Sequence, residues 1–314
     1  GALAHSLTLK QAEVIALKRS SEINALTAQS QELHEDAIAN SQLVDPKLNI
    51  ALANMPSNSF NFSQEPMTQF QIAIEQILPK GASLKYIFYS LEQKSQAKSF
   101  TKKTTKLQIL QKVRQSWLIL AFWSNAKRVL NKELAVFENL TNVTQGMLAN
   151  NKAQQKDVIM AQLELSEVTN RLINIKQNIK ISRAELARWL GESNAKNINP
   201  SHMPFWSLRS TADVFKGLKK HSILKADQKL INAKKSQIQL AKEQFKIGFA
   251  LGAGYGFRQG NNMNGTKRAD FVSLKLAMSL PVLPFNRQNR HLKSKQLSLI
   301  SQQNIRQTHL REIK

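Results

Sequence analysis

The chain carries one pattern twice, and the two copies begin about 200 residues apart, which is the spacing of an internal duplication. In each copy a helical stretch leads into a segment of alternating apolar and polar residues, a polar loop, a second alternating segment and a proline. The matched positions are Leu48, Ile50, Leu52, Phe70, Ile72, Ile74, Leu78 and Pro79 in the first copy, and Phe249, Leu251, Ala253, Val272, Leu274, Leu276, Leu280 and Pro281 in the second. Two copies of one unit are therefore expected.

The alternation predicts four β-strands, each with one apolar face. The segments are 47–55, 70–78, 249–258 and 272–280. Each has about nine residues, the length of a tilted strand that crosses a membrane. A soluble sheet packed on helices is the alternative.

Two features favour the membrane interpretation. The non-apolar face of the strands is small and polar, as expected for a wall facing water, and includes Gly252, Gly254 and Gly256. Aromatic residues gather near one end of the strands, like the girdle of a membrane barrel. They are Phe60, Phe62, Phe70, Tyr255, Phe257 and Phe271. Four strands cannot close a barrel and lipid tolerates no open edges, so a membrane-spanning sheet of this size must oligomerise.

The remaining sequence predicts long helices. Residues 82–148 contain no proline and residues 153–190 contain neither proline nor glycine. The second stretch has a heptad seam, which indicates coiled-coil packing. The seam is Val158, Ala161, Leu165, Val168, Leu172, Ile175, Ile179, Ser182, Leu186 and Trp189. An antiparallel helical hairpin turning near 148–152 is expected, with Gly191 ending the return helix. We expect an irregular connector over 192–212 and one helix over 213–245.

The composition excludes several function classes. The chain has no cysteine, so disulfides and thiolate chemistry are excluded. The net charge is +24, but the basic residues are spread along the helices, which favours solvated helix faces over a nucleic-acid surface. No catalytic set, phosphate-binding loop or metal-ligand spacing of histidines is present, so we expect a non-enzyme without cofactor or metal. The segment Ala2-Leu3-Ala4 has the form of a signal-peptidase site, which predicts export.

Several short motifs resemble the TolC family of outer-membrane efflux channels. They are Leu7-Thr8-Leu9-Lys10-Gln11-Ala12, Ser21-Glu22-Ile23-Asn24-Ala25, His221-Ser222-Ile223-Leu224-Lys225-Ala226, Asp157-Val158-Ile159-Met160-Ala161 and Arg183-Ala184-Glu185-Leu186-Ala187-Arg188-Trp189-Leu190-Gly191. Three others are similar to the CzcC-like heavy-metal branch. They are Asp45-Pro46-Lys47-Leu48, Asn54-Met55-Pro56 and Gln76-Ile77-Leu78-Pro79-Lys80-Gly81. The resemblance covers residues 6–314.

The resemblance implies a fold that is mainly α with membrane β. Three chains would form a homotrimer with a 12-stranded barrel in the outer membrane, four strands from each chain, and a periplasmic tunnel of helices. Such a channel is the exit duct of a tripartite pump with a membrane-fusion adaptor and an inner-membrane transporter of the RND type. It conducts cations or small toxic compounds passively. Only residues 284–314 remain for a second helical hairpin, so the resemblance implies a truncated chain that lacks the gate residues.

The resemblance also divides the chain. The segments expected are an N-terminal segment and first helix (1–45), a first transmembrane hairpin (46–81), a periplasmic helical hairpin (82–191), a connector and helix (192–245), a second transmembrane hairpin (246–283) and the start of a second helical hairpin (284–314).

Two sets of candidate site residues follow. Lys47, Glu75, Arg258 and Lys275 stand on the polar strand faces and would line the lumen, although lysine there could simply keep the face wet. The hairpin tip is the candidate for adaptor contact, although an ordinary solvated turn is the alternative. It comprises Met147, Leu148, Ala149, Asn150, Asn151, Lys152 and Ala153. The competing functions are a periplasmic coiled-coil adaptor or scaffold without a barrel, and a basic nucleic-acid-binding coiled coil.

Overall fold

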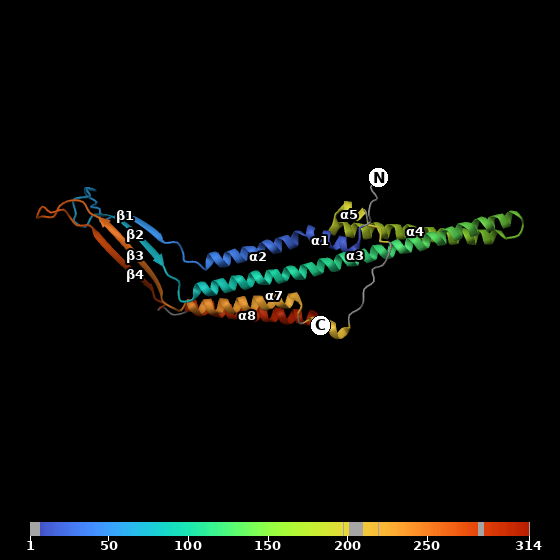
Figure 1. Ribbon diagram of the computed structural model, residues 1–314. Helices are drawn as coiled ribbons and strands as arrows, with labels where there is room; N and C mark the ends of the chain where they lie inside the picture. The colour runs from blue at the N-terminus through green and yellow to red at the C-terminus, as the bar shows by residue number, and fades with distance from the viewer. Residues whose placement is uncertain (1–6, 197, 201–209, 219, 282–285, 314) are drawn as a thin grey trace. The chain divides into compact units, whose positions relative to one another are not determined.

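The computed structural model describes residues 7–196, 198–200, 210–218, 220–281 and 286–313 (Figure 1). The export motif Ala2-Leu3-Ala4 and Pro284 lie outside these residues. The chain forms two compact units, which are described separately. Unit 1 contains residues 1–25 and 102–214, and unit 2 contains residues 26–101 and 215–314. None of the described helices combines the length and the apolar composition needed to cross a membrane.

Unit 1 is built on an antiparallel helical hairpin. Helix α3 (Ser83–Ala149) enters this unit at Lys102, and α4 (Gln155–Leu190) returns along it. Asn151 adopts a left-handed backbone with φ of 55° at the turn, and Gly191 ends α4 with φ of 84°. Both residue types tolerate such angles, so the predicted turn and helix end are confirmed.

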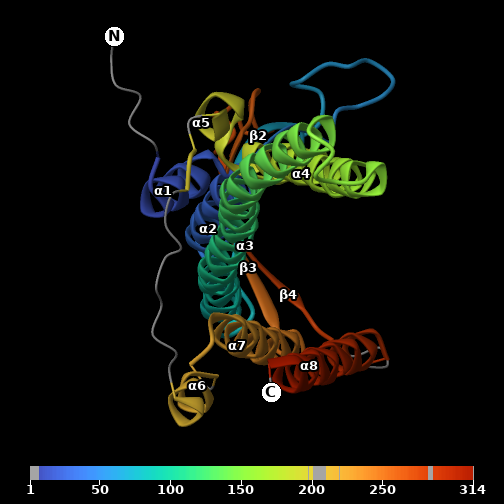
Figure 2. The same ribbon diagram turned by 90° about the vertical axis from the view of Figure 1, so that its right-hand side faces the viewer.

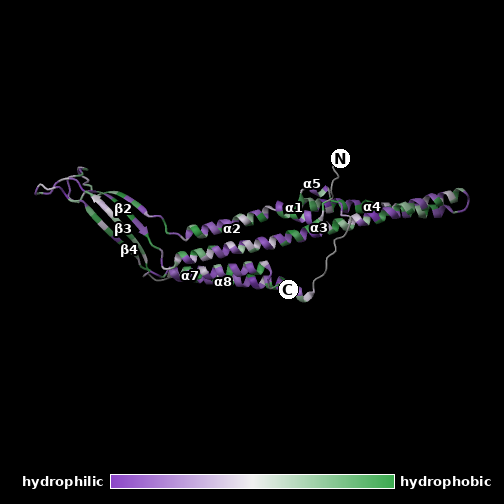
Figure 3. Ribbon diagram, in the orientation of Figure 1, coloured by the Kyte–Doolittle hydropathy of each residue, from purple (hydrophilic) through white to green (hydrophobic). Residues whose placement is uncertain are grey.

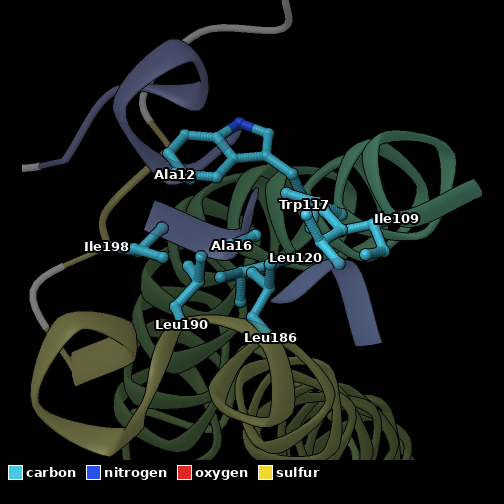
Figure 4. Packing of buried hydrophobic residues seen from close by; sticks show 10 residues of the cluster. Ala12, Ala16, Ile109, Trp117, Leu120, Leu186, Leu190 and Ile198 are labelled. Atoms are coloured by element: carbon cyan, nitrogen blue, oxygen red, sulfur yellow. The ribbon is translucent and has the colours of Figure 1, made fainter. Parts of the chain in front are cut away.

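The core of unit 1 joins α1 (Leu9–Arg19), α3, α4 and the segment that follows α4. Figure 4 shows Leu186 and Leu190 of α4 packed with Ala16 of α1 and Leu120 of α3. A second cluster along the hairpin contains Leu130, Val168 and Leu172. The buried residues of α4 follow the predicted heptad seam, except that Leu190 rather than Trp189 is buried at its end.

The helix expected over 213–245 is two helices. Helix α6 (Thr211–Leu218) is separated from α7 (Ser222–Glu243) by a break at His221. The ring of His221 accepts a hydrogen bond from the backbone N–H of Ile223 at 3.3 Å and so caps α7. A side-chain cap competes with the hydrogen bonds of a continuous helix. The spacing of apolar residues does not reveal such a cap, so the sequence predicted one helix. A short helix, α5 (Glu192–Lys196), also lies in the connector expected to be irregular.

Unit 2 contains one antiparallel sheet in the order β1-β2-β3-β4. The strands are β1 (Lys47–Ala53), β2 (Gln69–Ile77), β3 (Gly248–Phe257) and β4 (Phe271–Ser279), so all four predicted strands are confirmed with ends shifted by one or two residues. Asn54 ends β1 with φ of 56°. Because β2 pairs with β3, the two hairpins form one sheet although the whole of α4 lies between them in the chain.

The helices of unit 2 pack in pairs. Helix α2 (Ser21–Asn40) contacts the first part of α3 through Ser30, whose hydroxyl lies 3.1 Å from that of Ser95. Helices α7 and α8 (Asn286–Ile313) run side by side (Figure 2). At the end of β2, Gly81 turns the chain into α3 with φ of 52°, and Glu243 of α7 accepts a hydrogen bond from the N–H of Ala82 at 2.7 Å.

Candidate functional site: the two faces of the sheet

One face of the sheet is apolar and exposed. The strand register places Leu48, Ile74, Ala253 and Leu274 in one lateral row, and Ile50, Ile72, Tyr255 and Val272 in the next. Leu274 is 86% exposed and Val272 is 78% exposed. Figure 3 shows apolar residues along the strands. A soluble sheet packed on helices would bury these side chains, but the described residues leave them exposed. Exposed apolar patches of this kind mark surfaces that contact a membrane or another protein.

The opposite face is small and polar. Gly252, Gly254 and Gly256 of β3 lie on it, which confirms that their alternation belongs to a strand and is not a phosphate-binding loop. A Cβ at position 256 would collide with the carboxamide oxygen of Gln69, which lies across the glycine. A Cβ at position 254 would lie 2.9 Å from Oγ of Ser273. The glycines therefore let side chains of β2 and β4 lie across β3.

The register brings three of the four lumen candidates together. Lys47 pairs with Glu75, Glu75 with Gly252, and Gly252 with Lys275. Nζ of Lys275 lies 3.0 Å from Oε2 of Glu75, two strands away. The alternation of apolar and polar residues predicted that these residues share a face. It did not predict that they lie in one lateral row across the strands.

Arg258 lies apart from that row, at the loop end of β3. Its guanidinium stacks 3.8 Å from the ring centre of Phe271 and donates hydrogen bonds to the carbonyls of Ala269 and Pro66, at 2.6 and 3.0 Å. Arg268, which the sequence did not single out, donates to the carbonyls of Ser63, Glu65 and Gln259. Both arginines tie the loop of one hairpin to that of the other.

The aromatic residues lie at this same loop end. Phe70 and Phe257 are opposite each other in β2 and β3, and Phe271 starts β4. Phe60 of the first loop is 74% exposed. Phe70 and Phe257 share the apolar face, where a girdle at a membrane interface is expected. Phe271 pairs with Gly256 and therefore lies on the polar face, beneath Arg258, which does not fit the expected girdle.

The helical tip, the second candidate site, belongs to unit 1. The N–H of Lys152 donates to the carbonyl of Met147 at 2.8 Å, and the side chain of Asn150 donates to the carbonyl of Gly146 at 2.7 Å. These bonds close the turn, while Met147, Asn150 and Lys152 are exposed. The tip is thus an ordered turn with an accessible surface.

Titratable groups outside the strands form helix–helix contacts. The hydrogen bond with Glu92 raises the pKa of His34 above its usual range, and the same bond lowers the pKa of Glu92. The hydrogen bond from the Lys246 side chain lowers the pKa of the Glu243 carboxyl, and the hydrogen bond from the N–H of Ala82 lowers it further. The described part of the chain contains no group of three His, Cys, Asp or Glu that could hold a metal ion.

The arrangement of long helices and a four-stranded sheet with one apolar face is the fold of outer-membrane channels. The protein is structurally similar to the outer-membrane protein VceC of Vibrio cholerae, with a TM-score of 0.74 over 97% of this chain and 75% of that one, at 16% identity. It is also similar to CusC, a transmembrane channel, with a TM-score of 0.72 over 98% and 73% of the two chains, at 10% identity. A third similar structure is the CmeC outer-membrane channel of Campylobacter jejuni, with a TM-score of 0.70, 11% identity and coverage of 96% and 67%.

These similarities confirm the fold class and, at the level of fold, the resemblance to TolC-family channels. The sequence matches no protein-family model and no curated relative.

Proposed function

We propose that the protein is the outer-membrane channel, or exit duct, of a tripartite efflux system. The observation that carries this proposal is a sheet with an exposed apolar face, a small polar face and two open edges. Lipid would cover the apolar face and water the polar face, as in transmembrane barrels. The structural similarity to outer-membrane channels supports the same assignment.

The open edges β1 and β4 require partners. Unpaired backbone groups at a sheet edge are unfavourable in lipid, so β4 of one copy would pair with β1 of the next until the sheet closes. Three copies would give a 12-stranded barrel, four strands from each. The segments 46–81 and 246–283 would then be the transmembrane hairpins, and 82–191 the periplasmic hairpin of a helical tunnel.

The remaining partners follow from this arrangement. The tip 147–153 would contact a periplasmic membrane-fusion adaptor, which would connect the duct to an inner-membrane transporter of the RND type. The duct would conduct cations or small toxic compounds passively, without catalysis. The CzcC-like motifs support a place in the heavy-metal branch.

Cysteine cross-linking of the edges tests the proposal cleanly because the chain has no cysteine of its own. One variant carries Asn49→Cys in β1 together with Ser273→Cys in β4, and companion variants move the second cysteine to 271 or 275. Within one chain β1 and β4 are about 14 Å apart, three strand spacings, which is too far for a disulfide. Oxidation in outer-membrane vesicles should therefore give a ladder that ends at a covalent trimer.

The matched control is Asn49→Cys with Ala73→Cys, which pair directly in β1 and β2 and should cross-link within the chain only. The proposed channel function would be contradicted if every edge variant stayed monomeric after oxidation and the protein appeared in the soluble fraction and not in the membrane fraction. That result would favour the alternative, a periplasmic coiled-coil adaptor or scaffold.

A further inference from the structure

We propose that Lys47, Glu75 and Lys275 form a positively charged band inside the channel that makes its conductance selective for anions over cations. This inference rests on the proposed function, in which the polar face of the sheet lines the lumen. Within the proposed range of cargo it favours anionic compounds, or metals carried as anionic complexes, over free cations.

The first argument is the distribution of charge in the sheet. Strands β1 to β4 contain three charged residues in all, namely Lys47, Glu75 and Lys275. The register places all three in one lateral row, which is completed by Gly252. The next row consists of Asn49, Ala73, Gly254 and Ser273 and is uncharged. Within the strands, the charge of the polar face is therefore concentrated in a single row, and Arg258 lies beyond the end of β3, bonded to loop carbonyls.

The second argument is the contact across β3. Gly252 has no side chain, so Lys275 reaches across it to Glu75 at 3.0 Å. A Cβ at position 252 would lie 3.4 Å from Cβ and 3.9 Å from Cδ of Lys275. The lysine side chain therefore passes at van der Waals distance over Gly252.

The third argument is that the row contributes little to stability. The side chain of Lys275 is 68% exposed and that of Glu75 is 23% exposed. Exposed ion pairs of this kind contribute about 0–1 kcal/mol. Neutral polar residues would keep the face wet equally well, so a charged row points to a role in the lumen.

The sign of the band follows from its composition. Lys275 offsets the charge of Glu75, and Lys47, which pairs with Glu75 on the other side, leaves each copy with a net positive charge. Because barrel strands tilt by roughly 35–45°, the row in each copy would climb along the pore, and the charges would form a band rather than a flat ring. At low salt the field of such a band reaches about 30 Å, far enough to act on ions throughout a pore.

The experiment measures the reversal potential of the purified oligomer in a planar bilayer, under a KCl gradient centred near 0.01 M, where screening is weakest. The wild-type channel should prefer chloride. The double variant Lys47→Gln/Lys275→Gln leaves Glu75 as the charge of this row, so the reversal potential should shift toward potassium. Glu75→Gln should shift it further toward chloride. The charge swap Glu75→Lys/Lys275→Glu keeps the net charge and should keep the preference.

Ser273→Gln is the matched control, because it changes the size but not the charge of a side chain one row away on the same face. Equal single-channel conductance in this control and the wild type establishes that the pore is intact. If the reversal potential is unchanged in both the double variant and Glu75→Gln, the inference is wrong, but the proposed channel function is unaffected. A wild-type protein without any conductance would overturn the proposed function and the inference together.

Discussion

His309 of α8 holds the buried carboxylate of Asp227 in α7, with its Nδ1 2.7 Å from Oδ2. Asp227 is 3% exposed, and its other oxygen lies 3.4 Å from Nε2 of Gln302, also in α8. A carboxylate buried between two helices needs such partners, because it has lost its hydration. The pair therefore fixes how α8 lies along α7.

Replacing His309 by alanine should weaken the α7–α8 pair. Among the described residues, the carboxylate of Asp227 would keep the 3.4 Å contact with Gln302, and leaving a buried acceptor unpaired costs about 1–3 kcal/mol. Amide hydrogen exchange in α8 should be correspondingly faster than in the control Gln303→Ala, whose side chain is exposed. Equal exchange in both variants would show that the pair does not hold α8.

Contact between α2 and α3 should depend on pH through His34 and Glu92. The raised pKa of His34 stabilises the pair below 6.5, its ordinary value, and this contribution is lost as the pH rises through the raised pKa. The lowered pKa of Glu92 stabilises the pair above 4.5, and that contribution is lost as the pH falls through the lowered pKa. Protection factors of amides in α2 should thus be highest between these two values. The variant His34→Gln should lose the decline on the alkaline side, and an unchanged decline would exclude this pair as its cause.

Truncating the core of unit 1 should destabilise it strongly. Leu120 is fully buried among α1, α3 and α4, and removing a buried leucine side chain costs roughly 2–5 kcal/mol. The neighbouring Ile119 is 51% exposed, so Ile119→Ala is the control on the same helix. Urea unfolding of the purified protein, followed by tryptophan fluorescence, to which Trp117 of this cluster contributes, measures both variants. Similar midpoints would show that the cluster does not form the core.

Adding a methyl group at Gly81 should disturb the junction between β2 and α3. Gly81 has φ of 52°, and its Cβ would collide with the carboxylate of Glu243. A non-glycine residue in such a conformation costs on the order of 1–3 kcal/mol. Gly81→Ala should therefore speed amide exchange at the start of α3. Gly146→Ala, for which a Cβ meets nothing within 4 Å, should instead stabilise its helix by up to about 1 kcal/mol.

Local patterns were enough to predict the four strands and the long helical hairpin of this fold. Period-two alternation depends only on neighbouring residues, and it located β1 to β4 and separated their faces correctly. The heptad seam did the same for α4, and Asn151 and Gly191 marked the turn and the helix end through their backbone preferences. The break at His221 was missed because a side-chain cap interrupts a helix without interrupting its apolar pattern.

The sequence by itself determined which residues share a face, since side-chain direction follows from position along a strand or helix. Only the tertiary structure decided which residues on that face meet. The row of Lys47, Glu75 and Lys275, the stacking of Arg258 on Phe271 and the contact of Asp227 with His309 join residues that are distant in the chain. These contacts depend on which strands and helices pair and in what register. Periodicity within one strand excludes a register slip by one residue, which would move every side chain to the other face. It does not choose between registers that differ by two residues, and these are decided by turns and by packing between elements.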